Sequence, residues 1–170
     1  ELRDNPDMSD AELLQAETTR SGRFNQAKAL LEHLKTEGHL NESVPVLLGG
    51  DFNCPSHLDW TNDTRRVFER RRALDLPVSQ LVLDAGFDDT FRKIHPNPVQ
   101  HPGITWSPMY RGSLSEEEGT PQSFERIDRL YVHKRNENLS SSLVPVAAHV
   151  LPIVWEADDI PAEERIFPSD

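Results

Sequence analysis

Two polar side chains, Asp51 and Asn53, stand one residue apart, directly after a short apolar run and a pair of glycines. Residues 44–48 are apolar and partly β-branched, which is the pattern of a buried strand. If the chain stays extended there, the two-residue period of a strand turns both polar side chains to one side and Phe52 to the other. A carboxylate would then lie beside an amide that also donates hydrogen bonds. This pair suits a metal-bound phosphate and a water molecule.

A third polar residue, Asp128, stands in a second segment with the pattern of a strand. Residues 126–132 read Arg-Ile-Asp-Arg-Leu-Tyr-Val, and their aliphatic and aromatic members favour a strand. A charge within a buried strand costs free energy unless it is paired. We therefore expect Asp128 to have a partner. The alternative is an aspartate that caps a neighbouring turn.

The order of these segments resembles that of a known superfamily. Residues 50–53, Gly-Asp-Phe-Asn, are similar to the GDFN signature of the endonuclease/exonuclease/phosphatase superfamily, a pancreatic-type deoxyribonuclease-like fold. Abasic-site endonucleases, inositol polyphosphate phosphatases and neutral sphingomyelinases are further members. Downstream, the chain resembles the superfamily's D-x-(F/W)-R, HP, TW, R-I-D and P-S-D-H elements in order, at residues 89–92, 95–96, 105–106, 126–128 and 168–170.

The resemblance covers about residues 20–170 and implies that residues 1–170 are the C-terminal portion of a single domain. The implied fold is α+β, part of a four-layer αββα sandwich of mainly antiparallel sheets, with the N-terminal part of the domain missing. That part would carry a metal-binding glutamate and an asparagine. The histidine of the P-S-D-H motif would follow Asp170. We therefore expect the complete domain to be active and residues 1–170 alone to be inactive.

The resemblance implies a role for each matched residue. Asp51 would orient or deprotonate the attacking water and help to bind Mg²⁺ or Mn²⁺, and Asn53 would donate to a phosphate oxygen. Asp128 would hold the catalytic histidine in one tautomer, and Asp170 would bind metal or position that histidine. The implied activity is a metal-dependent phosphodiesterase that uses water to hydrolyse a phosphate ester. The substrate would be a small molecule, a lipid headgroup or a nucleic acid.

Two further residues are candidates for substrate binding. His57 lies in a loop four residues after Asn53 and is expected to approach the phosphate; the alternative is a histidine whose hydrogen bonds fix the loop. Arg23 and Gln26 are neighbours on a helix and resemble the R-x-x-Q-A element that precedes GDFN in the superfamily. The alternative is an exposed pair on an ordinary amphipathic helix.

The charge balance restricts the partners. With 18 basic and 29 acidic residues, the net charge is −11, which argues against broad neutralisation of duplex DNA. Five arginines nevertheless cluster in residues 65–72, on a predicted helix over 61–73 with Val67 and Phe68 facing inward. This patch is either a solvated helix face or a polyanion site, which would favour an inositol-phosphate-type phosphomonoesterase. A third alternative is a non-catalytic binding module.

Other patterns predict the scaffold. Residues 9–37 favour one long helix, or two helices with a kink, and Ser9 and Glu12 form a capping-box pattern. Residues 77–84 favour a short helix ended by Gly86, and residues 143–155 favour one or two strands. No apolar run approaches the roughly 20 residues of a membrane span, no secretory signal is visible, and no obligate protein partner is implied. The compartment stays open.

Overall fold

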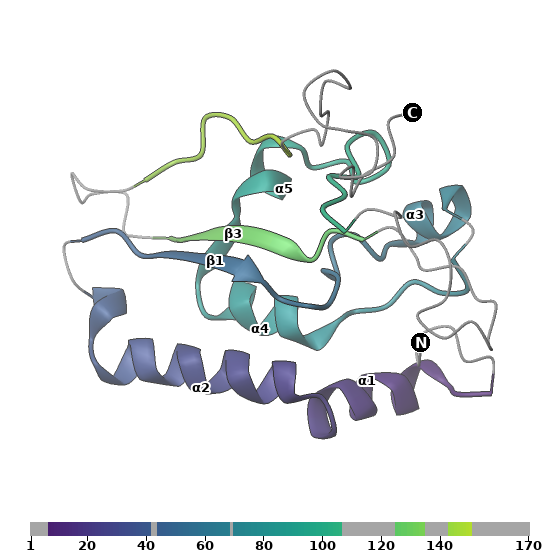
Figure 1. Ribbon diagram of the computed structural model, residues 1–170, viewed down its shortest axis with the longest axis horizontal. Helices are drawn as coiled ribbons and strands as arrows, with labels where there is room; N and C mark the ends of the chain where they lie inside the picture. Colours follow the sequence, from purple (N-terminus) through teal and green to yellow (C-terminus); the bar gives the residue numbers. More distant parts are fainter. Residues whose placement is uncertain (1–6, 42–43, 69, 107–124, 135–142, 151–170) are drawn as a thin grey trace, which may run out of the picture.

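The computed structural model describes residues 7–41, 44–68, 70–106, 125–134 and 143–150. Within these ranges, helices lie against a three-stranded antiparallel sheet, so the fold is α+β, as predicted (Figure 1). In chain order the elements are α1 (Asp10–Thr19), α2 (Gly22–Thr36), η2 (His39–Asn41), β1 (Leu47–Asp51), α3 (Asn62–Val67), α4 (Pro77–Asp84), β2 (Phe87–Asp89), α5 (Thr90–Ile94) and β3 (Asp128–His133). Among the described residues, no helix is long and apolar enough to cross a membrane.

The sheet has the strand order β1-β3-β2, with β3 in the middle and antiparallel to both neighbours. The register pairs Leu47 with Val132 and Asp51 with Asp128. β1 begins three residues later than the predicted strand and runs through both glycines instead of stopping at them. Gly49 can belong to the strand because the side chain of Leu130, on β3, covers it. A Cβ atom at Gly49 would lie only 3.0 Å from Leu130 Cδ1.

One face of the sheet forms the main core against α2 and α4. Tyr131 and Phe87 are fully buried there, with Val82 from α4 and Leu31 from α2. Phe52 packs its ring edge-to-face on Tyr131, with 5.3 Å between ring centroids. Phe52 therefore points into the core, as the two-residue period of the strand predicted.

The opposite face of the sheet carries exposed apolar side chains. Leu47 is 56% exposed and Leu130 is 48% exposed, although both lie in paired strands. Residues 143–150 run beside this face as a chain without regular secondary structure, so the strands predicted over 143–155 are wrong for 143–150; the remainder lies outside the described residues. In Figure 1 this yellow-green segment lies on the side of β3 away from α2. One face is thus a helix-covered core, and the other is open.

The N-terminal region forms two helices, the second alternative of the prediction. The capping box at the start of α1 is confirmed, because Glu12 N–H donates to Ser9 Oγ and Ser9 N–H donates to Glu12 Oε2. At the other end, the hydroxyls of Thr18 and Thr19 donate to backbone carbonyls three and four residues earlier. Such bonds compete with the helical ladder, and α1 ends at Thr19.

The helix predicted over residues 61–73 is wrong in length and orientation. α3 spans only Asn62–Val67, and Val67 and Phe68 are exposed instead of facing inward. After Phe68 the chain turns, and the Arg70 guanidinium donates to the Asp59 carbonyl at 2.7 Å and lies over the Trp60 ring. A helix with five arginines in residues 65–72 would also gather like charges, which is unfavourable.

The helix predicted over residues 77–84 is confirmed as α4. Its proline occupies the first turn, where a missing N–H costs nothing. Gly86 follows with φ +92°, a left-handed conformation that ends the helix. The chain then enters β2 directly, which places Asp89 at the N-cap of α5, where its carboxylate accepts from Arg92 N–H at 3.1 Å.

The buried hydroxyl of Tyr131 provides a stability test of this core. It has no hydrogen-bond partner among the described residues, and burial raises the pKa of the phenol. An unpaired buried polar group costs about 1–3 kcal/mol, so Tyr131→Phe is expected to raise the free energy of unfolding by about 1 kcal/mol in urea titrations. Above about pH 10, the unfolded chain loses the phenolic proton first. The free energy of unfolding of the wild type should therefore fall more steeply above about pH 10 than that of Tyr131→Phe. A variant with a lower free energy of unfolding than the wild type would contradict the cost assigned to the buried hydroxyl.

Candidate functional site

Asp51 and Asn53 lie at the end of β1, where the chain leaves the sheet. Both side chains are exposed. The chain does not stay extended, however: Asn53 has φ +51°, and its N–H donates to Asp51 Oδ1 at 2.6 Å. This bond closes an Asx turn, a motif in which an aspartate side chain replaces a backbone acceptor. The turn brings the backbone N–H of Asn53 to the Asp51 carboxylate, and the convergence of the two side chains stays a prediction.

Asp128 faces Asp51 across the β1–β3 pair. Directly opposite residues of an antiparallel pair project to the same face with Cβ atoms about 5 Å apart, and like charges there are unfavourable. The expectation that Asp128 is buried and needs a partner is wrong, because its side chain is exposed. It is the first residue of β3, on the open face, and its backbone N–H donates to Thr105 Oγ1 at 3.0 Å.

The donor set at this sheet end fits a hard divalent cation with an incomplete protein shell. Two carboxylates lie opposite each other in the strand register, and the backbone N–H of Asn53 donates to one of them. No Lys or Arg within the described ranges forms an ion pair with either carboxylate. Mg²⁺ is commonly held by one or two carboxylates and otherwise by water and substrate oxygens. The described part of the chain offers no cluster of three or more His, Cys, Asp or Glu residues that would complete a protein-only shell.

Arg129 fixes the turn that carries Asn53. Its guanidinium lies 4.6 Å from the centroid of the Phe52 ring and donates to the Cys54 carbonyl at 2.7 Å. The two residues that flank Asn53 are therefore held by one buried cation from β3. Burial raises the pKa of the Cys54 thiol, while the positive charges of Arg129 and Arg23 act in the opposite direction. Sequence reasoning gave Arg129 no role.

A buried network of two aspartates and two arginines holds the segments around the site. Asp59 accepts from Arg92 Nε at 2.6 Å and from Arg126 Nε at 3.0 Å, and Asp89 accepts from Arg126 at 2.7 Å. All four side chains are at most 7% exposed. They come from the loop after Asn53, from β2 and α5, and from the residue two positions before β3. We call them the Asp–Arg network.

The Asp–Arg network neutralises its charges internally. Burial disfavours the charged form of Arg126, but the charges and hydrogen bonds of Asp59 and Asp89 outweigh it and raise the pKa of the guanidinium. The remaining donors of Arg92 are satisfied by the carbonyls of His95, His101 and Pro102. The D-x-F-R and R-I-D elements thus meet in one structure. The sequence showed their order along the chain but not this contact.

His57 lies apart from the carboxylates. Its backbone N–H donates to Ser79 Oγ at 2.8 Å, and its Nδ1 lies 2.7 Å from the same oxygen, which also donates to the Leu76 carbonyl. Burial lowers the pKa of the imidazole, which favours the neutral ring. These bonds fix the loop, as the alternative given above expects, and an approach of His57 to the phosphate stays a prediction. Trp60, three residues on, is buried.

The other predicted site residues have different outcomes. Arg23 is exposed in the first turn of α2, near enough to Cys54 for its charge to affect the thiol, so a role in substrate binding stays a prediction. Asp170 lies outside the described residues.

A groove of about 1210 Å³ runs along the open face of the sheet and reaches the carboxylate end. Gly50 and Asp128 line that end, and Leu130, Val132 and residues 143–150 line the apolar remainder. Thr105, in the predicted T-W element, accepts from the N–H groups of Ile127 and Asp128 and fixes the start of β3. Trp106, the second residue of this element, is 40% exposed.

Comparison with known proteins gives one relative. The chain is 40% identical to an uncharacterized protein of Caenorhabditis elegans over 90 residues, which are 53% of this chain and 28% of that protein. The matched region is thus less than a third of the relative's length. No family model matches the chain, and no solved structure matches it.

Proposed function

We propose that this chain belongs to a metal-dependent phosphoesterase that hydrolyses a phosphodiester by attack of water. The observation that supports this most strongly is the placement of Asp51 opposite Asp128, with Asn53 turned back onto Asp51. Two facing carboxylates at a solvent-exposed sheet end are unfavourable by themselves, and a bound Mg²⁺ or Mn²⁺ would remove that repulsion.

Each residue can perform one step. The metal, when bound, would supply charge neutralisation at a phosphate oxygen. The Asp51 carboxylate accepts a short bond from the Asn53 N–H within the described residues and retains lone pairs to orient or deprotonate a water. The Asn53 side-chain amide donates to a non-bridging phosphate oxygen as charge develops there. The Asp128 carboxylate is exposed on the open face and could orient a histidine supplied by another part of the protein.

We further infer that the complete domain is a four-layer αββα sandwich. The described sheet is covered by helices on one face, whereas Leu47 and Leu130 remain about half exposed on the other. Apolar patches that large mark interaction surfaces. A second sheet packed over this face would bury both leucines and would bring further ligands to the carboxylate end of the groove.

The proposal is tested by assaying the full-length protein on a diester and a monoester in parallel. We expect release of p-nitrophenol from bis-p-nitrophenyl phosphate in Mg²⁺ and its loss in EDTA, with recovery when Mg²⁺ is restored. Hydrolysis that persists in EDTA would contradict a metal-dependent mechanism.

The monoester decides between the two enzyme classes. Release from p-nitrophenyl phosphate alone would replace the diesterase by the phosphomonoesterase alternative, for which the arginines of residues 65–72 are the supporting observation. If neither ester is cleaved, titration calorimetry with Mg²⁺ follows. Binding without turnover of either ester supports the non-catalytic module.

A further inference from the structure

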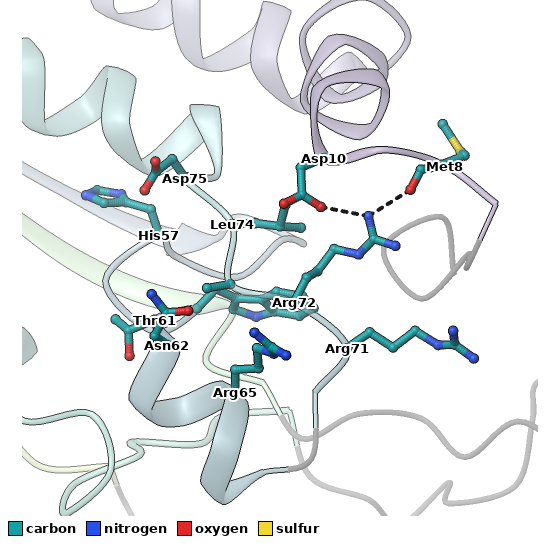
Figure 2. Close-up of a pocket in the computed structure, with 12 residues that line it drawn as sticks. Met8, Asp10, His57, Thr61, Asn62, Arg65, Arg71, Arg72, Leu74 and Asp75 are labelled. Atoms are coloured by element: carbon teal, nitrogen blue, oxygen red, sulfur yellow. Dashed lines mark hydrogen bonds and ion pairs between the residues drawn. The ribbon is translucent and has the colours of Figure 1, made fainter.

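The pocket beside His57 shares no lining residue with the groove at Gly50 and Asp128. It has a volume of about 810 Å³, and we call it the arginine pocket because Arg65, Arg71 and Arg72 line it. Figure 2 shows His57 and Asp75 at one end of the view, Arg71 at the other, and Arg65 and Arg72 between them. Asp51, Asn53 and Asp128 do not line this pocket.

The walls of the arginine pocket are fixed by packing and hydrogen bonds. Trp60 and Leu74, which are buried and belong to one apolar cluster, form part of the lining, and Leu74 N–H donates to the Trp60 carbonyl at 2.9 Å. Arg72 Nη1 donates to the Met8 carbonyl at 3.0 Å and to Asp10 Oδ1 at 2.9 Å, as the dashed lines of Figure 2 mark. The N-terminal segment is thereby held against residues 71–74.

The arginines in this region differ in whether their guanidinium groups already contact an acceptor. Arg66 pairs with Asp63 at 3.5 Å, Arg70 donates to the Asp59 carbonyl, and Arg72 pairs with Asp10. Arg65 and Arg71 are exposed, and neither forms an ion pair within the part of the chain that the structure describes. The pocket therefore presents two available guanidinium groups from two different segments.

We propose that the arginine pocket binds adjacent phosphate groups, as in a pyrophosphate or triphosphate moiety. A guanidinium binds phosphate through two parallel hydrogen bonds, and two such groups suit two phosphates better than one. A net charge of −11 opposes long polyanions over the surface as a whole. A compact polyanion, in contrast, would contact only the arginine pocket, part of whose lining is buried. This inference does not depend on the proposed phosphoesterase activity.

Titration calorimetry of the full-length protein with sodium tripolyphosphate tests this, in EDTA and about 0.15 M salt so that no metal mediates the binding. We expect saturable binding, with orthophosphate weaker. Arg65→Ala and Arg71→Ala should each weaken the affinity about ten-fold, the effect of removing one charge-assisted contact. Arg66→Ala is the matched control, because it removes the same charge one position away, outside the lining. Its effect should stay below two-fold.

A parallel titration with ATP separates the two sources of the ligand. Equal affinity for ATP and tripolyphosphate indicates recognition of the phosphates alone, and a preference for ATP indicates a nucleotide; both support the site. Three outcomes overturn it: no saturable binding of tripolyphosphate, an equal loss with Arg66→Ala, or tighter binding of a single-stranded oligonucleotide. Unchanged thermal melting of each variant shows that the exposed substitutions leave the fold intact.

Discussion

Replacing Arg126 by methionine is expected to lower the free energy of unfolding by about 3–5 kcal/mol. Methionine approximates the unbranched apolar stem of the arginine side chain but removes the charge and the donors to Asp59 and Asp89. Both carboxylates then remain buried with only part of their hydrogen bonding. Whole domains are stable by about 5–15 kcal/mol, so this one residue carries a large share. Urea unfolding followed by circular dichroism measures the loss.

Arg66→Ala is the control for this substitution. Arg66 and its partner Asp63 have side chains that are both 77% exposed, and exposed pairs contribute about 0–1 kcal/mol. If Arg126→Met and Arg66→Ala cost the same, the Asp–Arg network does not stabilise the fold. Asp59→Asn supplies a milder variant should Arg126→Met fail to fold. Where Arg126→Met does fold, the double variant with Asp59→Asn should lose less than the sum of the two single losses, because both residues act in one network.

Asp51→Asn is expected to lower the proposed phosphodiesterase turnover of the full-length protein by about 100-fold or more, with little change in stability. The amide retains an oxygen that can accept from Asn53 N–H, so the Asx turn is preserved while the charge is lost. Asp63→Asn removes one charge from an exposed helical position and serves as the control. Near-normal turnover of Asp51→Asn would remove this residue from the mechanism.

Asn53 needs a different design, because its φ is +51°. Alanine at a left-handed position adds about 1–2 kcal/mol of strain, which would mix a loss of stability with a loss of chemistry. Asn53→Gly removes the amide donor without that strain, and a fall in turnover of about 100-fold is expected for it as well. A metal readout accompanies both variants. Mg²⁺ should raise the melting temperature of the wild type by binding the folded state, and this rise should be lost in Asp51→Asn.

Local signals in the sequence predicted local structure well. The Ser9 capping box, the proline and glycine that bound α4, and the inward direction of Phe52 are set by neighbouring residues, so they were readable. The extent of α3 could not be predicted in this way, because after the helix the Arg70 guanidinium donates to the Asp59 carbonyl. This contact depends on tertiary structure.

The motifs singled out Asp51, Asn53 and Asp128 in the sequence. Strand pairing places Asp51 opposite Asp128, and an Asx turn joins the Asn53 N–H to Asp51; their shared role in a site stays a prediction. The exposure of Asp128 was missed because the phase of a strand does not tell which face of the sheet is covered. Asp59 and Arg129 were missed because an isolated charged residue in a sequence favours the surface. Only the fold shows that these charges are buried.

The position of β3 in the middle of the sheet has a consequence for biosynthesis. β1 and β2 are both complete by residue 89, but within the described residues each pairs only with β3, which begins at residue 128. On the ribosome, neither strand finds its partner until that later segment has emerged. Long-range pairing of this kind slows folding and leaves strand edges open to aggregation meanwhile. The nascent chain is therefore expected to engage chaperones over this interval.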